Sequence, residues 1–293
     1  MRTLTTAVRR RLIARELVES GILPVTWVSA SVEIPFANLG DALSPILLSA
    51  LTGLTIEHRA FDSHDIRMAS VGSIGHNLRN GSVHLWGTGF EPGWQRPAAT
   101  TFWVHGLRGP VSAQTLRSVG IDAPAVYGDP VWFLPSIFSP PVEKKYELGV
   151  IVHLAELAEK ADGAAVKPHF VRYNLPDELQ SSIRLINTIT PPTLEGIESR
   201  VNEILSCKRI ASTSLHGLVI AETYGIPCTY FRTLGQGAAV AAIDDETEPL
   251  NWRMRDFYAG IGNKTIFTYG QQRHIETDWL DLIDAIDRGW SPL

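Results

Sequence analysis

Cysteine is scarce in this sequence, and metal-binding motifs are missing from it. Cys207 and Cys228 are the two cysteines in 293 residues, they form no CxxC pair, and Cys228 lies in an apolar run typical of a buried strand. The nine histidines lack ligand spacing, and no HExxH, GxSxG or GxxxxGK[ST] motif occurs. We therefore expect two buried free thiols, as in a reducing cytosol, and neither a metal nor a cofactor.

A basic charge excess and a long apolar run are also missing. The formal net charge is −5 and the pI is about 6.0, which argues against nucleic acid as a partner. The most apolar stretch, residues 43–56, is too short and too interrupted to span a bilayer. Residues 1–20 lack the apolar core and cleavage site of a signal peptide, so we expect a cytoplasmic protein.

The N-terminal segment is rich in arginine. Its basic residues could contact anionic lipid headgroups, which would allow peripheral association with the inner face of a membrane. A solvated face of an amphipathic helix is the interpretation that we favour for such a charge run. The arginines concerned are Arg9, Arg10, Arg11 and Arg15.

Short β-like runs alternate with helical segments along the whole chain, which predicts an α/β fold. In the first half we expect strands at 23–30, 54–61, 81–87, 100–106 and 123–129, with helices at 39–53 and 109–120. In the second half we expect strands at 147–154, 167–174, 208–213, 227–232 and 263–270, and helices at 193–206, 215–225 and 276–290. The polar stretch 232–251 is typical of a mobile loop.

Prolines and a charged cluster in residues 134–148 indicate a linker between two doubly wound, Rossmann-like domains. We expect an N-terminal α/β domain at 1–139, on the acceptor side, and a C-terminal α/β domain at 140–275, on the donor side. Residues 276–293 would form a terminal helix that packs back on the body. A ligand would then bind in the cleft between the domains, at the carboxyl ends of their strands.

The stretch "IASTSLHGLVIAETYGIP" (210–227) places a histidine in the first turn of an apolar helix. Ser212, Thr213 or Ser214 can cap this helix, and Gly225 can end it. His216 then lies at the positive end of the helix dipole beside free backbone N–H groups, which is a natural anion site. It is a candidate phosphate ligand or proton donor; a core histidine bonded to a carbonyl is the equally weighted alternative.

"VHGLRGPVSAQTL" (104–116) repeats this strand-to-helix arrangement in the first half. Arg108 at its turn can present a planar guanidinium to a carboxylate or phosphate, and a surface salt bridge is the alternative. Arg108 and His216 would face each other across the cleft and bind a small, highly charged anion.

Three further strand ends carry candidate residues. Glycines at 87 and 89 would let a ligand approach the backbone, although no dinucleotide-binding GxGxxG is present. "ANLGDAL" has an acidic residue whose commoner role is a helix cap, and "YGDPVWFLP" has one that is typical of a structural turn. The residues at these ends are Gly87, Thr88, Gly89, Asn38, Asp41 and Asp129.

These motifs, in this order, resemble the polysaccharide pyruvyl transferase family, above all its bacterial exopolysaccharide members. The resemblance rests on "NLGDAL", "LWGTGF", "LRGP", "YGDPVWFLP", "STSLHGLVIAETYGIP" and "RMRDFYAGIG", and it covers roughly residues 25–275. It implies a GT-B-like fold and transfer of pyruvate from phosphoenolpyruvate to two hydroxyls of one sugar, as a cyclic ketal. The acceptor would be a polysaccharide or a lipid-linked oligosaccharide.

The resemblance also implies which residues act. Arg108 and His216 match the donor-site arginine and histidine of the family. We expect the backbone N–H groups near Ser214 and Leu215 to help hold the phosphate, and Gly217 to belong to the same donor site. Asp41 is a candidate base for the acceptor hydroxyl. The donor site would be completed by residues at other strand ends, namely Asn38, Gly87, Thr88, Gly89, His153 and Arg232. Some members have a lysine after the histidine helix; residues 228–236 contain none, and Arg232 is its candidate substitute.

Two other functions stay open from the sequence. A nucleotide-sugar-dependent glycosyltransferase can have the same two-domain shape. A noncatalytic glycan-binding homologue could retain a degenerate site, although the presence of both Arg108 and His216 argues against this alternative.

Overall fold

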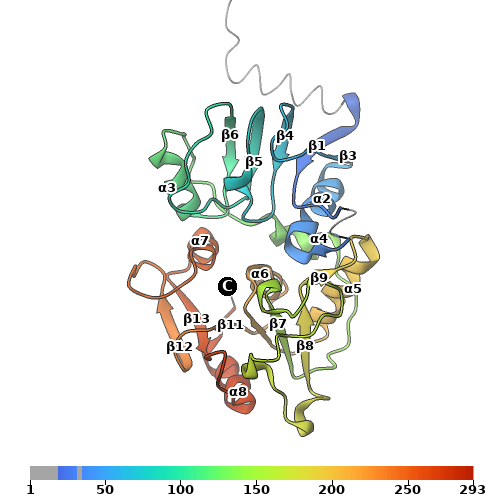
Figure 1. Cartoon of the computed structure of the whole chain (residues 1–293), viewed down its shortest axis with the longest axis vertical. Helices are drawn as coiled ribbons and strands as arrows, with labels where there is room; N and C mark the ends of the chain where they lie inside the picture. The colour runs from blue at the N-terminus through green and yellow to red at the C-terminus, as the bar shows by residue number, and fades with distance from the viewer. Residues whose placement is uncertain (1–18, 32–34, 293) are drawn as a thin grey trace, which may run out of the picture.

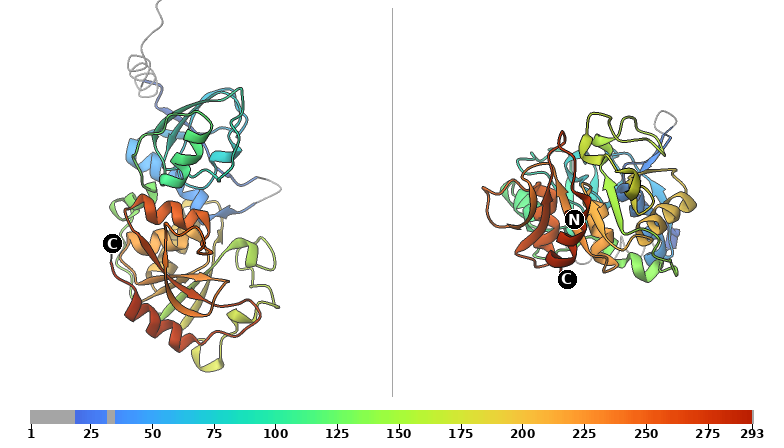
Figure 2. Two further views of the ribbon diagram at one scale, coloured as in Figure 1. Left: turned by 90° about the vertical axis from the view of Figure 1, so that its left-hand side faces the viewer. Right: turned by 90° about the horizontal axis from the view of Figure 1, so that it is seen from below.

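The computed structural model describes residues 19–31 and 35–292, and the N-terminal arginines, for which we weighed a solvated helix face against lipid contact, lie outside these residues. Figure 1 shows two lobes, each built on one sheet, with helices α6 (Leu215–Thr223) and α7 (Trp252–Gly260) between the sheets. In the view turned by 90°, α7 again lies at the boundary of the two lobes (Figure 2).

The first sheet has five parallel strands in the order β3-β1-β4-β5-β6 within the described part of the chain. Their bounds are β1 (Ile22–Thr26), β3 (Thr55–His58), β4 (Ile66–Ala69), β5 (Ser82–Trp86) and β6 (Thr101–Gly106). The helices of this half are α2 (Leu39–Thr52), α3 (Pro110–Ser118) and α4 (Leu134–Ile137), with 3-10 turns η1 (Gly75–Asn77) and η2 (Pro130–Phe133).

The second sheet has the order β12-β13-β11-β10-β7-β8, parallel except for the antiparallel edge strand β12. Its strands are β7 (Leu148–Val152), β8 (Ile183–Asn187), β10 (Ile210–Ser212), β11 (Cys228–Arg232), β12 (Gly237–Ala242) and β13 (Thr265–Gly270). All five residues of β7 are buried, as expected for a parallel strand covered on both faces. The other elements of this half are α5 (Leu194–Leu205), α8 (Trp279–Gly289) and the 3-10 turns η3 (Leu154–Glu156), η4 (Val171–Tyr173) and η5 (Asp177–Leu179).

Both sheets are Rossmann-like, so the predicted α/β class is confirmed, and the arrangement is consistent with a two-domain, GT-B-like fold. The two halves are not separated by solvent. A single apolar core includes Leu43 of α2, Val131 of η2, Ile151 of β7 and Leu218 of α6. A short antiparallel pair, β2 (Ala37–Asn38) with β9 (Ile189–Thr190), also links them. The domain limits at residues 139 and 275 stay a prediction.

Several predicted elements are wrong. Residues 123–129 form no strand, because Pro124 and Gly128 interrupt the run, and a single bridge joins Tyr127 to Leu107. Residues 167–174 contain the 3-10 turn η4 in place of a strand, and the expected loop at 232–251 contains the edge strand β12.

Strands β4 and β8 were not predicted from the sequence, because each carries an arginine in an otherwise apolar run. In β4 the buried Arg67 donates hydrogen bonds to backbone carbonyls of neighbouring loops, at distances of 2.6–3.3 Å. In β8 the half-exposed Arg184 pairs with Glu203. The two cysteines are free and buried, as predicted.

Candidate active site

A cavity of 320 Å³ lies where the strands of the two sheets end facing each other. The first half contributes residues after β1, β2 and β4, and the second half contributes residues after β7 and β10 and from α7. The lining side chains are Val28, Asn38, Asp41, Ser73, Ile74, His76, Asn77, His153, Leu154, Ser214, Leu215, His216 and Arg253. Six of the predicted site residues, Asn38, Asp41, His153, Ser214, Leu215 and His216, are therefore brought together here.

The N-terminus of α6 opens into this cavity. Strand β10 ends at Ser212, whose Oγ accepts a hydrogen bond from the Ser214 backbone N–H at 3.0 Å. Ser214 is the N-cap, but its side chain makes no capping hydrogen bond to the helix. The first turn therefore has N–H groups without a side-chain cap, and these can bind an anion. At the other end Gly225 has a φ of 64° after the last turn, as predicted for a helix stop.

His216 lies in the first turn of α6 and is fixed by close packing. A Cβ atom on Gly40 of α2 would lie 1.8 Å from Nδ1 of His216, so only a glycine fits at that position. On the other side, Nε2 of His216 lies 3.7 Å from Oδ2 of Asp129. Both of these atoms are buried, and neither has a hydrogen-bond partner among the described residues. The sequence predicts a structural turn at Asp129. In agreement, its Oδ1 accepts a hydrogen bond from the Val131 N–H at 3.0 Å and so caps η2.

Asp41 lies inside the first turn of α2, and Asn38 occupies the N-cap position that the sequence suggested for Asp41. The Asn38 amide donates a hydrogen bond to Oδ2 of Asp41 at 3.1 Å. Burial raises the pKa of the Asp41 carboxyl, while His216, the Asn38 bond and Arg253 oppose the rise. A carboxyl with a raised pKa inside a cavity can exchange protons with a ligand closer to neutral pH.

Arg253 is a charged residue of the cavity wall that the sequence did not predict. It lies in the first turn of α7, and its guanidinium also contacts the Trp252 ring, 5.8 Å from the ring centroid. Burial lowers its pKa, and the positive charge of Arg108 acts in the same direction. Its Nε is buried and without a partner among the described residues. An anion in the cavity would compensate this charge. The sequence feature that could have pointed to Arg253 is the run "RMRDFYAGIG", which resembles the family.

Two more histidines reach the cavity, and both are disposed to be neutral when it is empty. Burial, followed by the nearby Arg253 charge, lowers the pKa of His153. Its Nδ1 accepts the Ala155 N–H at 3.2 Å, so its neutral ring carries the proton on Nε2. The pKa of His76 is also lowered, mainly by burial.

Arg108 does not line the cavity. It is fully buried, and its Nε and Nη2 each lie 3.1 Å from Oδ2 of Asp256 in α7. Its Nη1 donates to Oγ of Ser73 at 2.5 Å, and Ser73 does line the cavity. Arg108 thus stands one hydrogen bond behind the cavity wall.

Other predicted donor residues lie elsewhere. Arg232 pairs with Glu248 and does not line the cavity. Thr88 is buried and donates to the Gly72 carbonyl at 2.9 Å. Gly89 gives room to the Arg108 guanidinium, since a Cβ there would lie 2.3 Å from Nη2. The two remaining glycines are also packed against neighbours: a Cβ on Gly87 would meet Pro130, and one on Gly217 would meet Ser212. Direct roles for these five residues stay predictions.

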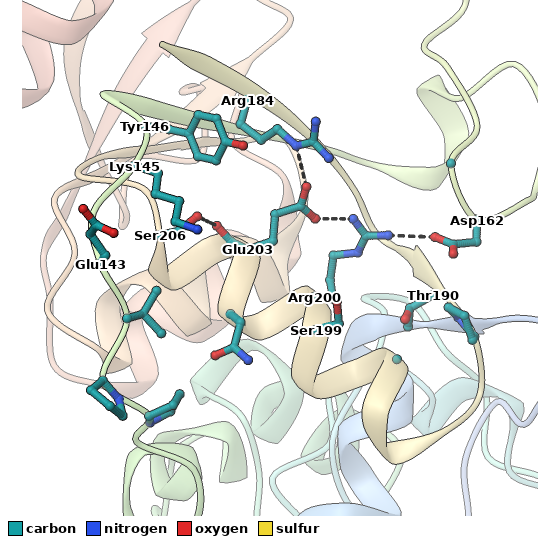
Figure 3. A pocket seen from close by; sticks show the side chains of 17 residues that line it. Glu143, Lys145, Tyr146, Asp162, Arg184, Thr190, Ser199, Arg200, Glu203 and Ser206 are labelled. Atoms are coloured by element: carbon teal, nitrogen blue, oxygen red, sulfur yellow. Dashed lines mark hydrogen bonds and ion pairs between the residues drawn. The ribbon is translucent and has the colours of Figure 1, made fainter. Parts of the chain in front are cut away.

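A larger cavity, of 790 Å³, contains none of the predicted site residues. Figure 3 shows that its arginines are bound to carboxylates of the same wall: Arg184 to Glu203 at 2.6 Å, and Arg200 to Asp162 at 2.8 Å and to Glu203. These two arginines are already paired with carboxylates, which makes them poor ligands for an anion.

Within residues 19–31 and 35–292, no group of three side chains has the arrangement of metal ligands. Over the same residues, no helix has the length and apolarity that crossing a bilayer requires.

Comparison with known proteins matches this sequence to one family. A search of curated proteins finds no match. A solved structure of a functionally uncharacterized protein from Klebsiella pneumoniae is similar, with 12% identity and a TM-score of 0.37, over 78% of this chain and 90% of that one. The family described as polysaccharide pyruvyl transferase matches residues 73–233, which is more than half of the sequence. The chain therefore belongs to the polysaccharide pyruvyl transferase family.

Proposed function

We propose that this enzyme transfers pyruvate from phosphoenolpyruvate to two hydroxyls of one sugar, in a polysaccharide or a lipid-linked oligosaccharide, and forms a cyclic ketal. Family membership supports pyruvyl transfer to a polysaccharide. The observation that carries the finer proposal is the cavity in which Arg253, His216 and the open first turn of α6 meet. Phosphoenolpyruvate has a phosphate and a carboxylate, and both need such partners.

The two anionic groups can be assigned to different walls. The phosphate suits the N-terminus of α6, where backbone N–H groups and the helix dipole favour negative charge. The carboxylate suits the Arg253 guanidinium, which can bind both of its oxygens. Arg108 acts in this proposal through Ser73, whose hydroxyl it holds on the cavity wall.

The reaction needs one proton donor and one proton acceptor. His216 adds a proton to C3 of the enol, which makes C2 electrophilic. One sugar hydroxyl then bonds to C2 and gives its proton to Asp41, and phosphate leaves with the electrons of its bond to C2. The second hydroxyl bonds to C2 and closes the ring. The two sugar hydroxyls release two protons. One restores the proton that His216 gave to C3, and the other leaves with the phosphate, so the atoms balance.

Calorimetric titration of phosphoenolpyruvate tests the donor site. We expect binding by the wild type and a loss of about tenfold to a hundredfold in affinity in Arg253→Ala and in His216→Ala, since each removes a charge-assisted hydrogen bond. Arg288→Ala is the matched control, because Arg288 is exposed on α8, and its affinity should equal the wild type.

The same titration with a nucleotide sugar addresses the glycosyltransferase alternative. Binding of the nucleotide sugar without binding of phosphoenolpyruvate would overturn the proposal. Turnover is followed by release of inorganic phosphate with a panel of glycans, and the ketal methyl group is identified by NMR in the product. Donor binding without turnover on any glycan would favour the noncatalytic homologue.

A further inference from the structure

A third cavity, of 520 Å³, lies beside the candidate active site, and four aromatic side chains line it. It is formed at the carboxyl ends of β5 and β6, by the turn that leads into η2 and by the end of α7. Figure 1 shows α7 beneath the ends of these strands. The lining residues are Trp86, Gly106, Leu107, Val126, Tyr127, Gly128, Asp129, Pro130, Trp132, Phe133, Gly260 and Ile261.

The rings in this cavity are unusually exposed for their size. Trp132 is 40% exposed and Phe133 is 47% exposed. The Trp86 ring is stacked on that of Phe133, with 6.0 Å between centroids and 27° between planes. Because Trp86, Trp132 and Phe133 line the same cavity, they form one exposed apolar patch, and such patches mark binding surfaces where single exposed side chains do not.

Other tryptophans of the described chain have different roles. Trp94 and Trp279 are buried in cores, and Trp252 lies against the guanidinium of Arg108, 5.1 Å from its ring centroid. Of the tryptophans that could contact a sugar, Trp86 and Trp132 are the two that meet in one cavity.

The aromatic cavity adjoins the donor site through a single side chain. Asp129 lines the aromatic cavity, and its Oδ2 lies 3.7 Å from Nε2 of His216, which lines the other. That carboxylate oxygen is buried and has no hydrogen-bond partner among the described residues. The Asp129 side chain is fully buried, so it forms part of the wall between the two cavities.

We propose that this aromatic cavity binds a pyranose ring of the acceptor glycan, an inference that rests on the proposed function. The apolar face of the ring packs on Trp132 and Phe133, and one of its hydroxyls bonds to the Tyr127 phenol. A volume of 520 Å³ is within the range of small-ligand sites and exceeds the space that one hexose needs. The chemistry of the wall, with aromatic faces and few polar groups, suits a neutral sugar and not a second anion.

Saturation-transfer NMR with methyl β-glucoside, methyl β-galactoside and methyl α-mannoside tests this inference. We expect signals at the ring C–H protons of at least one glycoside with the wild type. In Trp132→Ala and in Phe133→Ala the affinity should fall about tenfold, because each loses one stacking face. Trp103→Ala is the matched control, since Trp103 lies on β6 but lines a different cavity, and it should bind as the wild type does. Thermal unfolding of each variant verifies its fold.

Absence of a signal from all three glycosides with the wild type would overturn the inference, and so would unchanged binding in both Trp132→Ala and Phe133→Ala. Phosphoenolpyruvate is titrated into the same samples. Donor binding without sugar binding would refute the aromatic subsite alone. Sugar binding without donor binding would refute the proposed function and leave a sugar site in the aromatic cavity.

Discussion

Arg108 and Asp256 join the two halves of the molecule through an ion pair that solvent does not reach. Nε of Arg108 lies 3.1 Å from Oδ2 of Asp256, and both side chains are fully buried. The same carboxylate accepts the backbone N–H of Ser112 at 2.9 Å and its hydroxyl at 2.6 Å. The first turn of α3 and the middle of α7 are thereby held together.

Loss of Asp256 should destabilise the protein severely. Asp256→Ala leaves the Arg108 charge buried and unpaired, and we expect a loss of about 3–5 kcal/mol in the free energy of unfolding. Urea denaturation measures this loss. Arg288→Ala, which breaks an exposed pair with Asp281, should change stability by less than about 1 kcal/mol. A small effect of Asp256→Ala would mean that the pair does not hold the halves together.

Apolar replacement of both partners separates structure from binding at this position. Arg108→Met with Asp256→Leu should recover part of the lost stability, since no unpaired charge remains. If Arg108 acts through Ser73, the double variant should bind phosphoenolpyruvate about tenfold more weakly than the wild type. Unchanged affinity would restrict Arg108 to a structural role.

Asp41→Asn should make the protein more stable and less active. Because the pKa of Asp41 is raised in the folded state, the native protein holds the proton more tightly than the unfolded chain. The carboxyl therefore lowers the free energy of unfolding as the pH rises above its pKa in the unfolded chain, and at neutral pH its replacement should raise Tm. The carboxamide oxygen can still accept the Asn38 bond. Differential scanning calorimetry and phosphate release measure the two effects, and a lower Tm would contradict this reasoning.

Gly40→Ala should damage the site without altering any residue that lines it. Alanine normally favours a helix by up to about 1 kcal/mol over glycine. Here the new Cβ would lie 1.8 Å from Nδ1 of His216 and must displace the ring. We expect phosphoenolpyruvate affinity to fall about tenfold, as when one hydrogen bond to a charged group is lost. Ser49→Ala on the exposed part of α2 is the control. Full affinity in Gly40→Ala would mean that His216 does not touch the donor.

Donor binding should take up protons. The lowered pKa values of His76 and His153 leave these rings neutral in the empty site, and a bound anion favours their protonated forms. At about pH 7.5 a phosphate monoester is already dianionic, so the protons must come to the protein. Calorimetry in two buffers of different ionisation enthalpy measures the uptake, which should decrease in His76→Gln and in His153→Gln. Proton release on binding would contradict the assignment.

The sequence predicted the elements whose signals are local. The histidine helix was found because serines precede it, Gly225 ends it and its other residues are apolar. The strands β4 and β8 were missed because Arg67 and Arg184 interrupt their apolar runs. The five backbone carbonyls that accept hydrogen bonds from Arg67 come from loops that only the folded structure brings together.

The site was predicted in part for the same reason. His216 and Asp41 stand at helix starts, which sequence can locate. Arg253 has no local mark that distinguishes it from Arg255, whose guanidinium bonds to the carbonyls of Ile243, Asp245 and Glu248. Which arginine of α7 faces the cavity depends on how that helix packs against α3, and the buried bonds of Asp256 to Arg108 and Ser112 are part of that contact.

The apolar core that α2 and η2 share with α5 and α6 makes the two halves one thermodynamic unit. Leu43 and Val131 from the first half are as inaccessible as Ile151 and Leu218 from the second. Neither half could be expressed alone without exposing these side chains, and heat should melt the whole protein in one transition. The cavity around His216 and Arg253 therefore forms only when both halves are folded together.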